Sequence, residues 1–196
     1  MARPNNNRQN NQKIDSVLIA NRGEIACRII RTLRKMDIKS IAVYSDADAN
    51  SLHVQMADEA YYIGQSGANE SYLNIRHILD ALVLSGAQAV HPGYGFLSEN
   101  YEFAKTLHDA KIRLIGPSPK VIKQMGDKIE AKKVAQAAGV STVPGYIGVI
   151  NSAEEAIEIA KNIGFPVILK AAAGGGGRGM RVVHDADGIP DAFESA

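Results

Sequence analysis

The chain has 196 residues, 45% of them hydrophobic and 22% charged, and its formal net charge at pH 7 is +1. This is the composition of an ordinary globular protein, and a near-neutral chain without a long basic block gives no electrostatic basis for binding nucleic acid. Cys27 is the single cysteine, which excludes an internal disulfide, and no apolar run reaches the roughly 18 residues that a membrane span needs. We therefore expect a soluble protein of a reducing compartment, with neither a membrane nor a nucleic acid as partner.

Residues 1–12, MARPNNNRQNNQ, are rich in Asn and Gln and offer nothing apolar to bury. This composition predicts a disordered leader. The segment is basic and contains no acidic residue, but it lacks the amphipathic, arginine-rich helix of a mitochondrial presequence. A cytoplasmic location is therefore favoured, with the mitochondrial matrix as the expectation for a eukaryotic source.

Residues 13–126 alternate between apolar strands and amphipathic helices. Strands are expected at residues 16–21, 39–46, 59–63, 87–91 and 112–116. Helices are expected between them: one after the first strand with an apolar face that reaches Met36, one from Ser71 to Gly86, and one after Ser98. Alternation of this kind predicts an α/β fold built on a doubly wound, Rossmann-like parallel sheet.

The pattern changes after Gly116, and residues 127–196 form a second predicted domain. PSPKVIKQMGDK predicts a short helix and a glycine turn, so the boundary is placed near Gly126. A new helix is expected from Asp127 to Gly139, and another from the capping box Ser152–Glu155 to Gly164. The residues from Asp185 onward predict a third helix.

Two segments at the carboxyl ends of predicted strands are candidate sites, because open parallel sheets bind ligands there. Gly23 and Asp46 lie where a dinucleotide-binding fold has its phosphate turn and ribose carboxylate, but the fingerprint needs three glycines and only one is present. A tight turn with solvated acids is the favoured alternative. In HPGYGFLSEN, residues 91–100, His91 and Glu99 are candidates for supporting a site. A core histidine and a carboxylate in the first turn of a helix explain them equally well.

FPVILKAAAGGGGRGMRVV, residues 165–183, places five glycines within six residues, between two apolar runs. Glycine loses more backbone entropy on ordering than any other residue, and a hairpin turn needs only about two residues. A flexible linker is the alternative, which the flanking strands make less favourable. A glycine backbone can wrap its N–H groups around phosphate oxygens, and Lys170 adds a positive charge at the strand end. The lysine precedes the glycines, so the Walker pattern is absent. Lys128, at a predicted helix start, is a further candidate for an anion contact, with a solvated surface lysine as the commoner explanation.

Four segments in this order, IANRGEIACRIIR, HPGYGFLSEN, MGDK and FPVILKAAAGGGGRGMRVV, resemble the amino-terminal part of biotin carboxylases. The likeness covers nearly the whole chain from Lys13 onward, and four matches at compatible spacing are far more specific than a glycine run. The first third of the chain looks most like alpha subunits of acyl-CoA carboxylases of the methylcrotonyl-CoA or propionyl-CoA type. The resemblance implies a pre-ATP-grasp domain at residues 13–126, followed at 127–196 by the lid of an ATP-grasp domain that is incomplete at its carboxyl end.

The resemblance also implies roles for single residues. Lys128 and Lys170 would contact the phosphates of ATP, and Met180 would lie near the adenine. Arg28 and Arg31 match a region that forms the dimer in bacterial relatives, although Lys35 stands where a glutamate is common there. The implied phosphate loop consists of Gly174, Gly175, Gly176 and Gly177.

The implied ligands are ATP with Mg²⁺ or Mn²⁺, and biotin on a carrier domain as co-substrate. The implied partners are a biotin carboxyl carrier domain, a carboxyltransferase subunit and further copies in a homo-oligomer. The family's reaction joins bicarbonate to ATP as carboxyphosphate and then carboxylates N1 of biotin.

The family's magnesium, bicarbonate and biotin ligands and its catalytic base match positions beyond Ala196, so no catalytic or metal-binding residue is expected within this chain. We therefore expect an amino-terminal fragment of a biotin carboxylase, a ligase, that is inactive alone. A non-catalytic nucleotide-binding or subunit-contact module is the main alternative, and a nicotinamide-dependent oxidoreductase is a weaker one.

Overall fold

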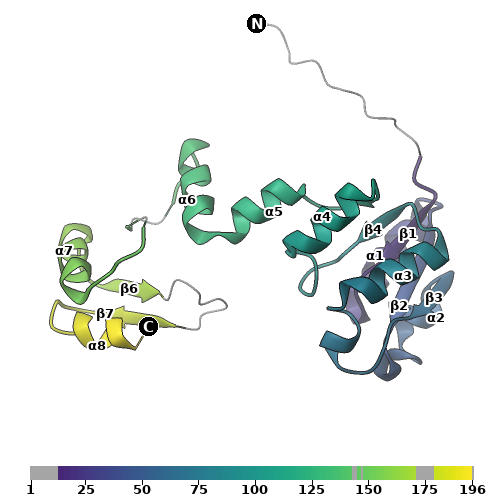
Figure 1. Ribbon diagram of the computed structural model, residues 1–196, viewed down its shortest axis with the longest axis horizontal. Helices are drawn as coiled ribbons and strands as arrows, with labels where there is room; N and C mark the ends of the chain where they lie inside the picture. The colour runs from purple at the N-terminus through teal and green to yellow at the C-terminus, as the bar shows by residue number, and fades with distance from the viewer. Residues whose placement is uncertain (1–12, 143–144, 147, 171–178, 196) are drawn as a thin grey trace, which may run out of the picture. The chain divides into compact units, whose positions relative to one another are not determined.

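The computed structural model describes residues 13–142, 145–146, 148–170 and 179–195, except for the side chain of Lys128 (Figure 1). The predicted leader, residues 1–12, therefore lies outside the described residues. The chain divides into two compact units, Met1–Gly126 and Asp127–Ala196, called unit 1 and unit 2 below. No helix among the described residues is both long and apolar enough to cross a membrane.

Unit 1 is built on a five-stranded sheet in the order β3-β2-β1-β4-β5, and every pair of neighbouring strands is parallel. This confirms the predicted α/β fold with a parallel sheet. The strands are β1 (Ser16–Ile19), β2 (Lys39–Tyr44), β3 (Glu59–Tyr62), β4 (Ala89–His91) and β5 (Arg113–Leu114). The last of these is shorter than the five residues predicted.

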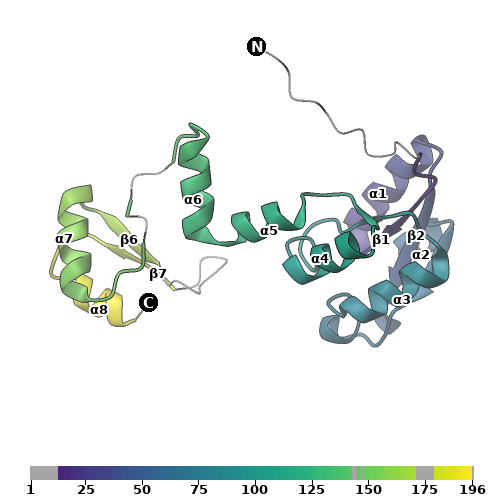
Figure 2. The same ribbon diagram turned by 45° about the horizontal axis from the view of Figure 1, so that its top comes forward.

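Helices cover both faces of this sheet, because successive residues of a strand point to opposite faces. Val17 and Ile19 of β1 pack with α1 (Gly23–Lys35), whereas Leu18 packs with α3 (Ile75–Ser85) and α4 (Tyr101–Asp109). Figure 2 shows α1 and α3 on opposite sides of the sheet. Unit 1 also contains α2 (Leu52–Met56), α5 (Pro119–Gly126) and two single turns of 3₁₀ helix, η1 (Asp46–Asp48) and η2 (Ala68–Glu70).

Three predicted details of unit 1 are wrong at helix ends. α3 begins at Ile75, not Ser71, because the side chain of Asn74 caps it by accepting from the backbone N–H of His77. Asn100 caps α4 in the same way, so Glu99 precedes the helix and does not lie in its first turn. Met36 is the C-cap of α1 and is 59% exposed, so it lies off the buried face. Gly86 ends α3 in the left-handed conformation, as predicted.

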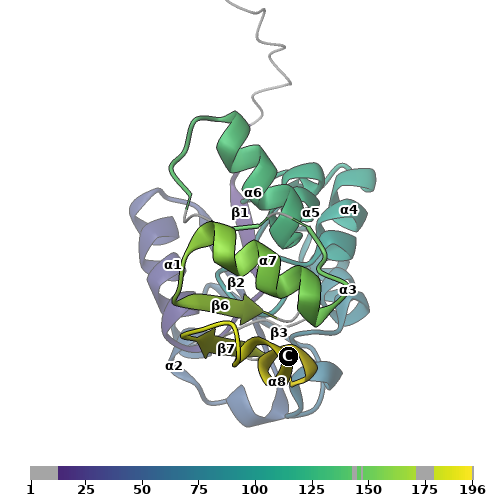
Figure 3. The same cartoon turned by 90° about the vertical axis from the view of Figure 1, so that its left-hand side faces the viewer.

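Unit 2 contains a two-stranded antiparallel hairpin, β6 (Val167–Lys170) and β7 (Met180–Val183), with helices on one face. α7 (Ala153–Ile163) and α8 (Ile189–Glu194) pack there with Val167 and Val183, and Figure 3 shows α7 over β6 and α8 beside β7. The predicted caps are present at Ser152 and Gly164. α8 starts later than the predicted Asp185, whose side chain instead accepts from the backbone N–H of Gly188. α6 (Lys128–Ala137) begins after its cap Asp127, as predicted.

Candidate functional site

The hairpin of unit 2 carries two of the predicted ATP-contacting residues on one face. Lys170 and Met180 are directly opposite each other across β6 and β7, and Ile168 lies opposite Val182. All four side chains are exposed, with Ile168 at 51%, Val182 at 60% and Met180 at 37%. Because the helices cover the other face, this face presents three apolar side chains and one cation outward. We call it the open face of the hairpin.

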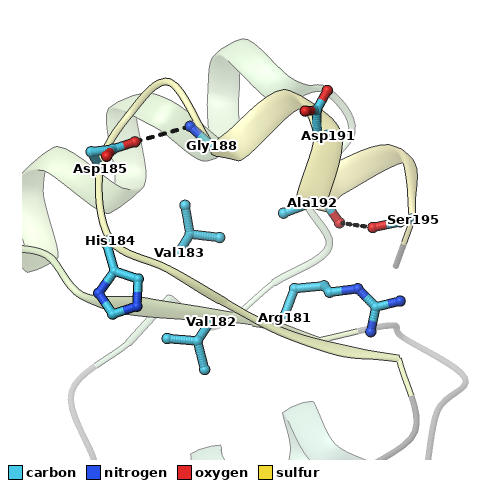
Figure 4. Close-up of a pocket in the computed structure, with 9 residues that line it drawn as sticks. All are labelled: Arg181, Val182, Val183, His184, Asp185, Gly188, Asp191, Ala192 and Ser195. Atoms are coloured by element: carbon cyan, nitrogen blue, oxygen red, sulfur yellow. Dashed lines mark hydrogen bonds between the residues drawn. The ribbon is translucent and has the colours of Figure 1, made fainter.

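The close-up in Figure 4 shows the two sides of β7. Val183 points toward α8, and Val182 points away from it. An open cavity of about 400 Å³ lies on the α8 side, lined by Arg181, His184, Asp191 and neighbouring residues. None of the predicted site residues lines this cavity, and Val182 is the one open-face residue among its lining residues.

The cation of the open face is available for a ligand. The side chain of Lys170 forms no ion pair or hydrogen bond with any residue that the structure describes. The predicted phosphate loop, Gly174, Gly175, Gly176 and Gly177, lies outside the described residues. Lys128 is the first residue of α6, where Asp127 accepts from the backbone N–H groups of Ile129 and Glu130, but its side chain is not described.

The carboxyl edge of the sheet in unit 1 is held together by a buried amide. Asn21 follows β1 and is only 4% exposed, and its Nδ2 donates to the carbonyls of Pro92 and Tyr94, at 2.8 Å each, beyond the neighbouring strand β4. Its Oδ1 accepts from the backbone N–H of Arg22. Helices leave β1 and β4 toward opposite faces, so this is the crevice where an open α/β sheet binds its ligand. In this chain the Asn21 side chain fills the crevice.

Gly93 makes room for that amide. Its φ is +64°, and a Cβ at this position would lie 2.8 Å from Asn21 Nδ2. Only glycine satisfies both the left-handed backbone and the close approach. The close packing of Asn21 on Gly93, beside a first turn with a single glycine, gives no support to the oxidoreductase alternative.

His91 supports the same turn, and Glu99 does not. The half-buried His91 accepts from the backbone N–H of Gly93 through Nδ1, at 3.0 Å. Burial lowers its pKa and so favours the neutral ring that can accept this bond. Glu99 is exposed and contacts no described member of the turn by a hydrogen bond. Tyr94 lies on the outside of the turn, 62% exposed, and its hydroxyl donates to Glu24.

A second network at this edge was not foreseen from the sequence. Asp48 accepts from Tyr72 at 2.7 Å and from Arg22 at 3.2 Å, and also from Ser45 and Ser51. The guanidinium of Arg22 lies 5.5 Å from the Tyr72 ring centre and 5.9 Å from that of Phe96, and the two rings stack on each other. Burial alone would raise the pKa of Asp48, but hydrogen bonds from Tyr72 and the other donors outweigh it and lower the pKa.

The predicted dimer residues lie on the exposed face of α1. Arg28 and Arg31, with Thr32, Arg34 and Lys35, line a basic groove of about 520 Å³. Arg28 donates to Thr32 within the helix, and Arg34 donates to the carbonyl of Met56. Elsewhere, no three His, Cys, Asp or Glu side chains among the described residues are grouped so that they could hold a metal ion.

Comparison with known families matches both units. Residues 13–122 match the model of the biotin carboxylase N-terminal domain, and residues 127–196 match the ATP-binding domain of the carbamoyl-phosphate synthase L chain. The fold and the matches thus define a protein with a parallel α/β unit followed by ATP-grasp sequence. The chain belongs to the biotin carboxylase family, a family of ligases.

The propionyl-CoA carboxylase alpha chain of Ruegeria pomeroyi is 55% identical over 182 residues, which are 93% of this chain and 27% of that protein. Among solved structures, a Campylobacter jejuni biotin carboxylase in complex with β,γ-ATP is 50% identical with a TM-score of 0.87, and the match covers 93% of this chain and 41% of that one. The biotin carboxylase domain dimer of Hydrogenobacter thermophilus 2-oxoglutarate carboxylase, bound to MgADP, ADP and bicarbonate, is 48% identical with a TM-score of 0.84, covering 94% and 42%. This chain thus spans between about a quarter and two fifths of these relatives.

Proposed function

We propose that the chain is the amino-terminal part of a biotin carboxylase that carboxylates carrier-bound biotin with ATP and bicarbonate. The observation that carries the proposal is the open face of the hairpin, where three apolar side chains and a lysine whose side chain has no partner among the described residues lie together at the ends of the glycine-rich segment. A cation suits the phosphates of a nucleotide, and apolar side chains suit the face of a purine base. The match of residues 127–196 to an ATP-binding domain supports the same assignment.

In this proposal the two units have different roles. Lys128, Lys170 and the loop Gly174–Gly177 bind the phosphates of ATP, and Met180 lies against the adenine. Unit 1, proposed as the pre-ATP-grasp domain of residues 13–126, supplies the turn around His91 at the carboxyl edge of its own sheet, and residues 127–196 supply the ATP-grasp lid. No described cluster of side chains fits Mg²⁺, so we assign the ion to none of them.

The overall reaction consumes ATP and bicarbonate. A bicarbonate oxygen attacks the γ-phosphorus, ADP leaves, and carboxyphosphate forms. The carboxyl group then passes to N1 of biotin, which loses its proton, and phosphate is released. The groups that carry out these steps are proposed to lie in the portion of the relatives that this chain does not span, so the chain alone is inactive.

The assembly is proposed to resemble that of the relatives. A biotin carboxyl carrier domain and a carboxyltransferase subunit would be the partners, and the high identity to propionyl-CoA carboxylase alpha chains favours propionyl-CoA as the acceptor. Arg28 and Arg31 are proposed to contact a second copy. The proposed compartment is the cytoplasm, or the mitochondrial matrix in a eukaryote.

The test is bicarbonate-dependent ATP hydrolysis with free biotin, measured on this chain and on a form extended through a complete ATP-grasp domain. We expect activity only in the extended form, with a requirement for both bicarbonate and biotin. An extended form that binds ATP without hydrolysing it would support the non-catalytic module. An extended form that does not bind ATP would exclude both functions.

A further inference from the structure

The turn between β4 and α4, residues 91–97, has an unusual backbone. Gly93, Gly95 and Phe96 all have positive φ, at +64°, +64° and +35°. The first two are glycines, for which this conformation is ordinary, but Phe96 carries a side chain that disfavours it. Such a conformation persists only where the surrounding structure holds it, and it is found preferentially at functional sites.

Two separate contacts hold this turn. On the backbone side, the Asn21 amide binds the carbonyls of Pro92 and Tyr94. On the side-chain side, the Phe96 ring stacks on Tyr72 with a centre distance of 5.1 Å and an angle of 10° between the rings, and Arg22 covers both. Phe96 is therefore held by contacts to its ring, and the adjoining backbone is held by hydrogen bonds to its carbonyls.

Asp48 fixes the two residues that hold the ring. It lies in η1 beyond β2, its side chain is 12% exposed, and it accepts from both Tyr72 and Arg22. Ser45 and Ser51 occupy its remaining acceptor sites. A carboxylate bound by four donors sets the position of each donor, and Arg22 has no other acidic partner among the described residues.

The turn faces the place where a ligand of this sheet would lie. It sits at the carboxyl end of β4, beside the crevice that Asn21 fills. A ligand at this edge would lie against the turn, so the conformation of the turn determines the shape of that surface. A residue that fixes this conformation therefore affects how the ligand is bound without contacting it.

We propose that Asp48 is a positioning residue of the enzyme: through Arg22 and Tyr72 it holds Phe96, and with it the β4–α4 turn, in the conformation that the reaction requires. This inference rests on the proposed function. It assigns to Asp48 no contact with a substrate. We expect the effect of Asp48 to be separate from ATP binding, because the proposed contacts to the nucleotide belong to unit 2, whereas Asp48, Arg22 and Tyr72 belong to unit 1.

Kinetics of the extended enzyme test the functional part. Asp48→Asn keeps the shape of the side chain and removes its charge, and we expect kcat for biotin- and bicarbonate-dependent ATP hydrolysis to fall at least tenfold, with the KM for ATP changed less than twofold. Tyr72→Phe is the milder variant, because it keeps the stacked ring and loses only the hydroxyl, with its bond to Asp48 and the bond that it accepts from the N–H of Ser45; we expect about a threefold to tenfold loss.

The matched control is Asp58→Asn. Asp58 is also a hydrogen-bonded carboxylate of unit 1, accepting from the N–H and hydroxyl of Ser40 at 2.8 and 2.6 Å, but it directly precedes β3, beside the amino end of β2, at the opposite edge of the sheet. We expect it to reduce thermal stability without lowering kcat. An equal loss of kcat in both variants, or a change confined to the KM for ATP, would overturn the positioning role.

Hydrogen exchange tests the coupling without any activity. In the 196-residue chain, the amides of Gly93 and Ser98 are bonded to His91 Nδ1 and to the carbonyl of Gly95. We expect Asp48→Asn to speed their exchange at least tenfold and Asp58→Asn to leave it unchanged. Unchanged exchange in Asp48→Asn would overturn the inference. An extended wild-type enzyme without bicarbonate-dependent hydrolysis would instead remove the proposed function, and exchange would still decide whether Asp48 holds the turn.

Discussion

The two units differ in how fully each buries its own apolar side chains. In unit 1, large side chains such as Leu18, Ile30 and Phe103 are fully buried, and the ligand crevice is filled by Asn21. In unit 2 the buried core is small and rich in alanine, and Ile168 and Val182 stand exposed on the open face. The carboxyl edge of the sheet in unit 1 is therefore closed by the unit's own side chains, whereas unit 2 has an apolar face that a ligand or further protein can cover.

This difference explains why the two halves of the sequence point to function in different ways. The signal in unit 2 is local, because a lysine, a glycine run and an apolar strand follow one another along the chain. The signal in unit 1 is dispersed, because its contacts join residues that are 24 to 73 positions apart. Four experiments test this difference between the two units.

The largest effect is expected for Gly93→Ala, which tests the rigidity of unit 1. The new Cβ meets Asn21 and the backbone is left-handed, so we expect a loss of about 3 kcal/mol in the free energy of unfolding. Gly95→Ala is the matched control, because it has the same φ but no atom within 4 Å of the new Cβ, and we expect a loss of about 1 kcal/mol. Urea denaturation measures both. Equal losses would show that Asn21 yields to the new atom.

Adjacent residues of β6 test the open face of unit 2. Leu169 packs on the core side, so Leu169→Ser should reduce the free energy of unfolding by about 2 kcal/mol. Ile168→Ser, on the open face, should change it by less than about 0.5 kcal/mol. Thermal denaturation of the chain distinguishes the two. A comparable loss in both variants would mean that the open face is covered within the chain itself.

Lys170→Ala tests whether the open face binds phosphate. In the extended enzyme we expect the KM for ATP to rise more than tenfold, which corresponds to about 1.4 kcal/mol. Lys161→Ala is the control, since Lys161 is an exposed lysine of α7 whose ion pair is with Glu158 in the same helix. An ATP dependence unaffected by Lys170→Ala would remove Lys170 from the proposed site.

The smallest effect is expected from pH, and it concerns unit 1. Burial lowers the pKa of both His53 and His91, so the folded chain keeps them neutral at a pH where the unfolded chain binds protons. The free energy of unfolding should therefore fall as the pH decreases below about 6.5. Urea denaturation at several pH values measures the slope.

His91→Asn should flatten this slope, because the amide oxygen can still accept from Gly93 but does not titrate in this range. A slope that persists in full in His91→Asn would show that this residue contributes nothing to the pH dependence.

Much of the fold could be predicted from sequence because it rests on local signals. Alternating apolar strands and helices indicated the parallel sheet, and capping residues such as Ser152 and Gly164 marked helix ends correctly. The start of α3 was misplaced because Ser71 and Asn74 are both good caps, and only the tertiary structure selects Asn74. Glu99 was misplaced for the same reason, since Asn100 is the cap of α4.

The candidate site could likewise be predicted from the sequence only where its signals are local. Lys170 could be selected from its position before the glycine run and Met180 only from the family resemblance, whereas their pairing across the hairpin required the structure. Asn21, Asp48 and Tyr72 carry no periodicity or spacing that marks them. Their importance arises from burial and from bonds between distant segments, and the one available signal was negative: the first turn has too few glycines for a dinucleotide.

The Asn21 side chain has a consequence for how proteins of this architecture are assigned. A sheet with this strand order is the usual framework of dinucleotide enzymes, and topology alone would suggest a redox cofactor here. Here one buried amide, opposite a glycine that leaves room for it, joins the turns after β1 and β4, and the first turn has a single glycine, so the strand order alone does not assign the cofactor. In such chains, the contents of a single gap between two strands discriminate among cofactors better than the arrangement of the whole sheet.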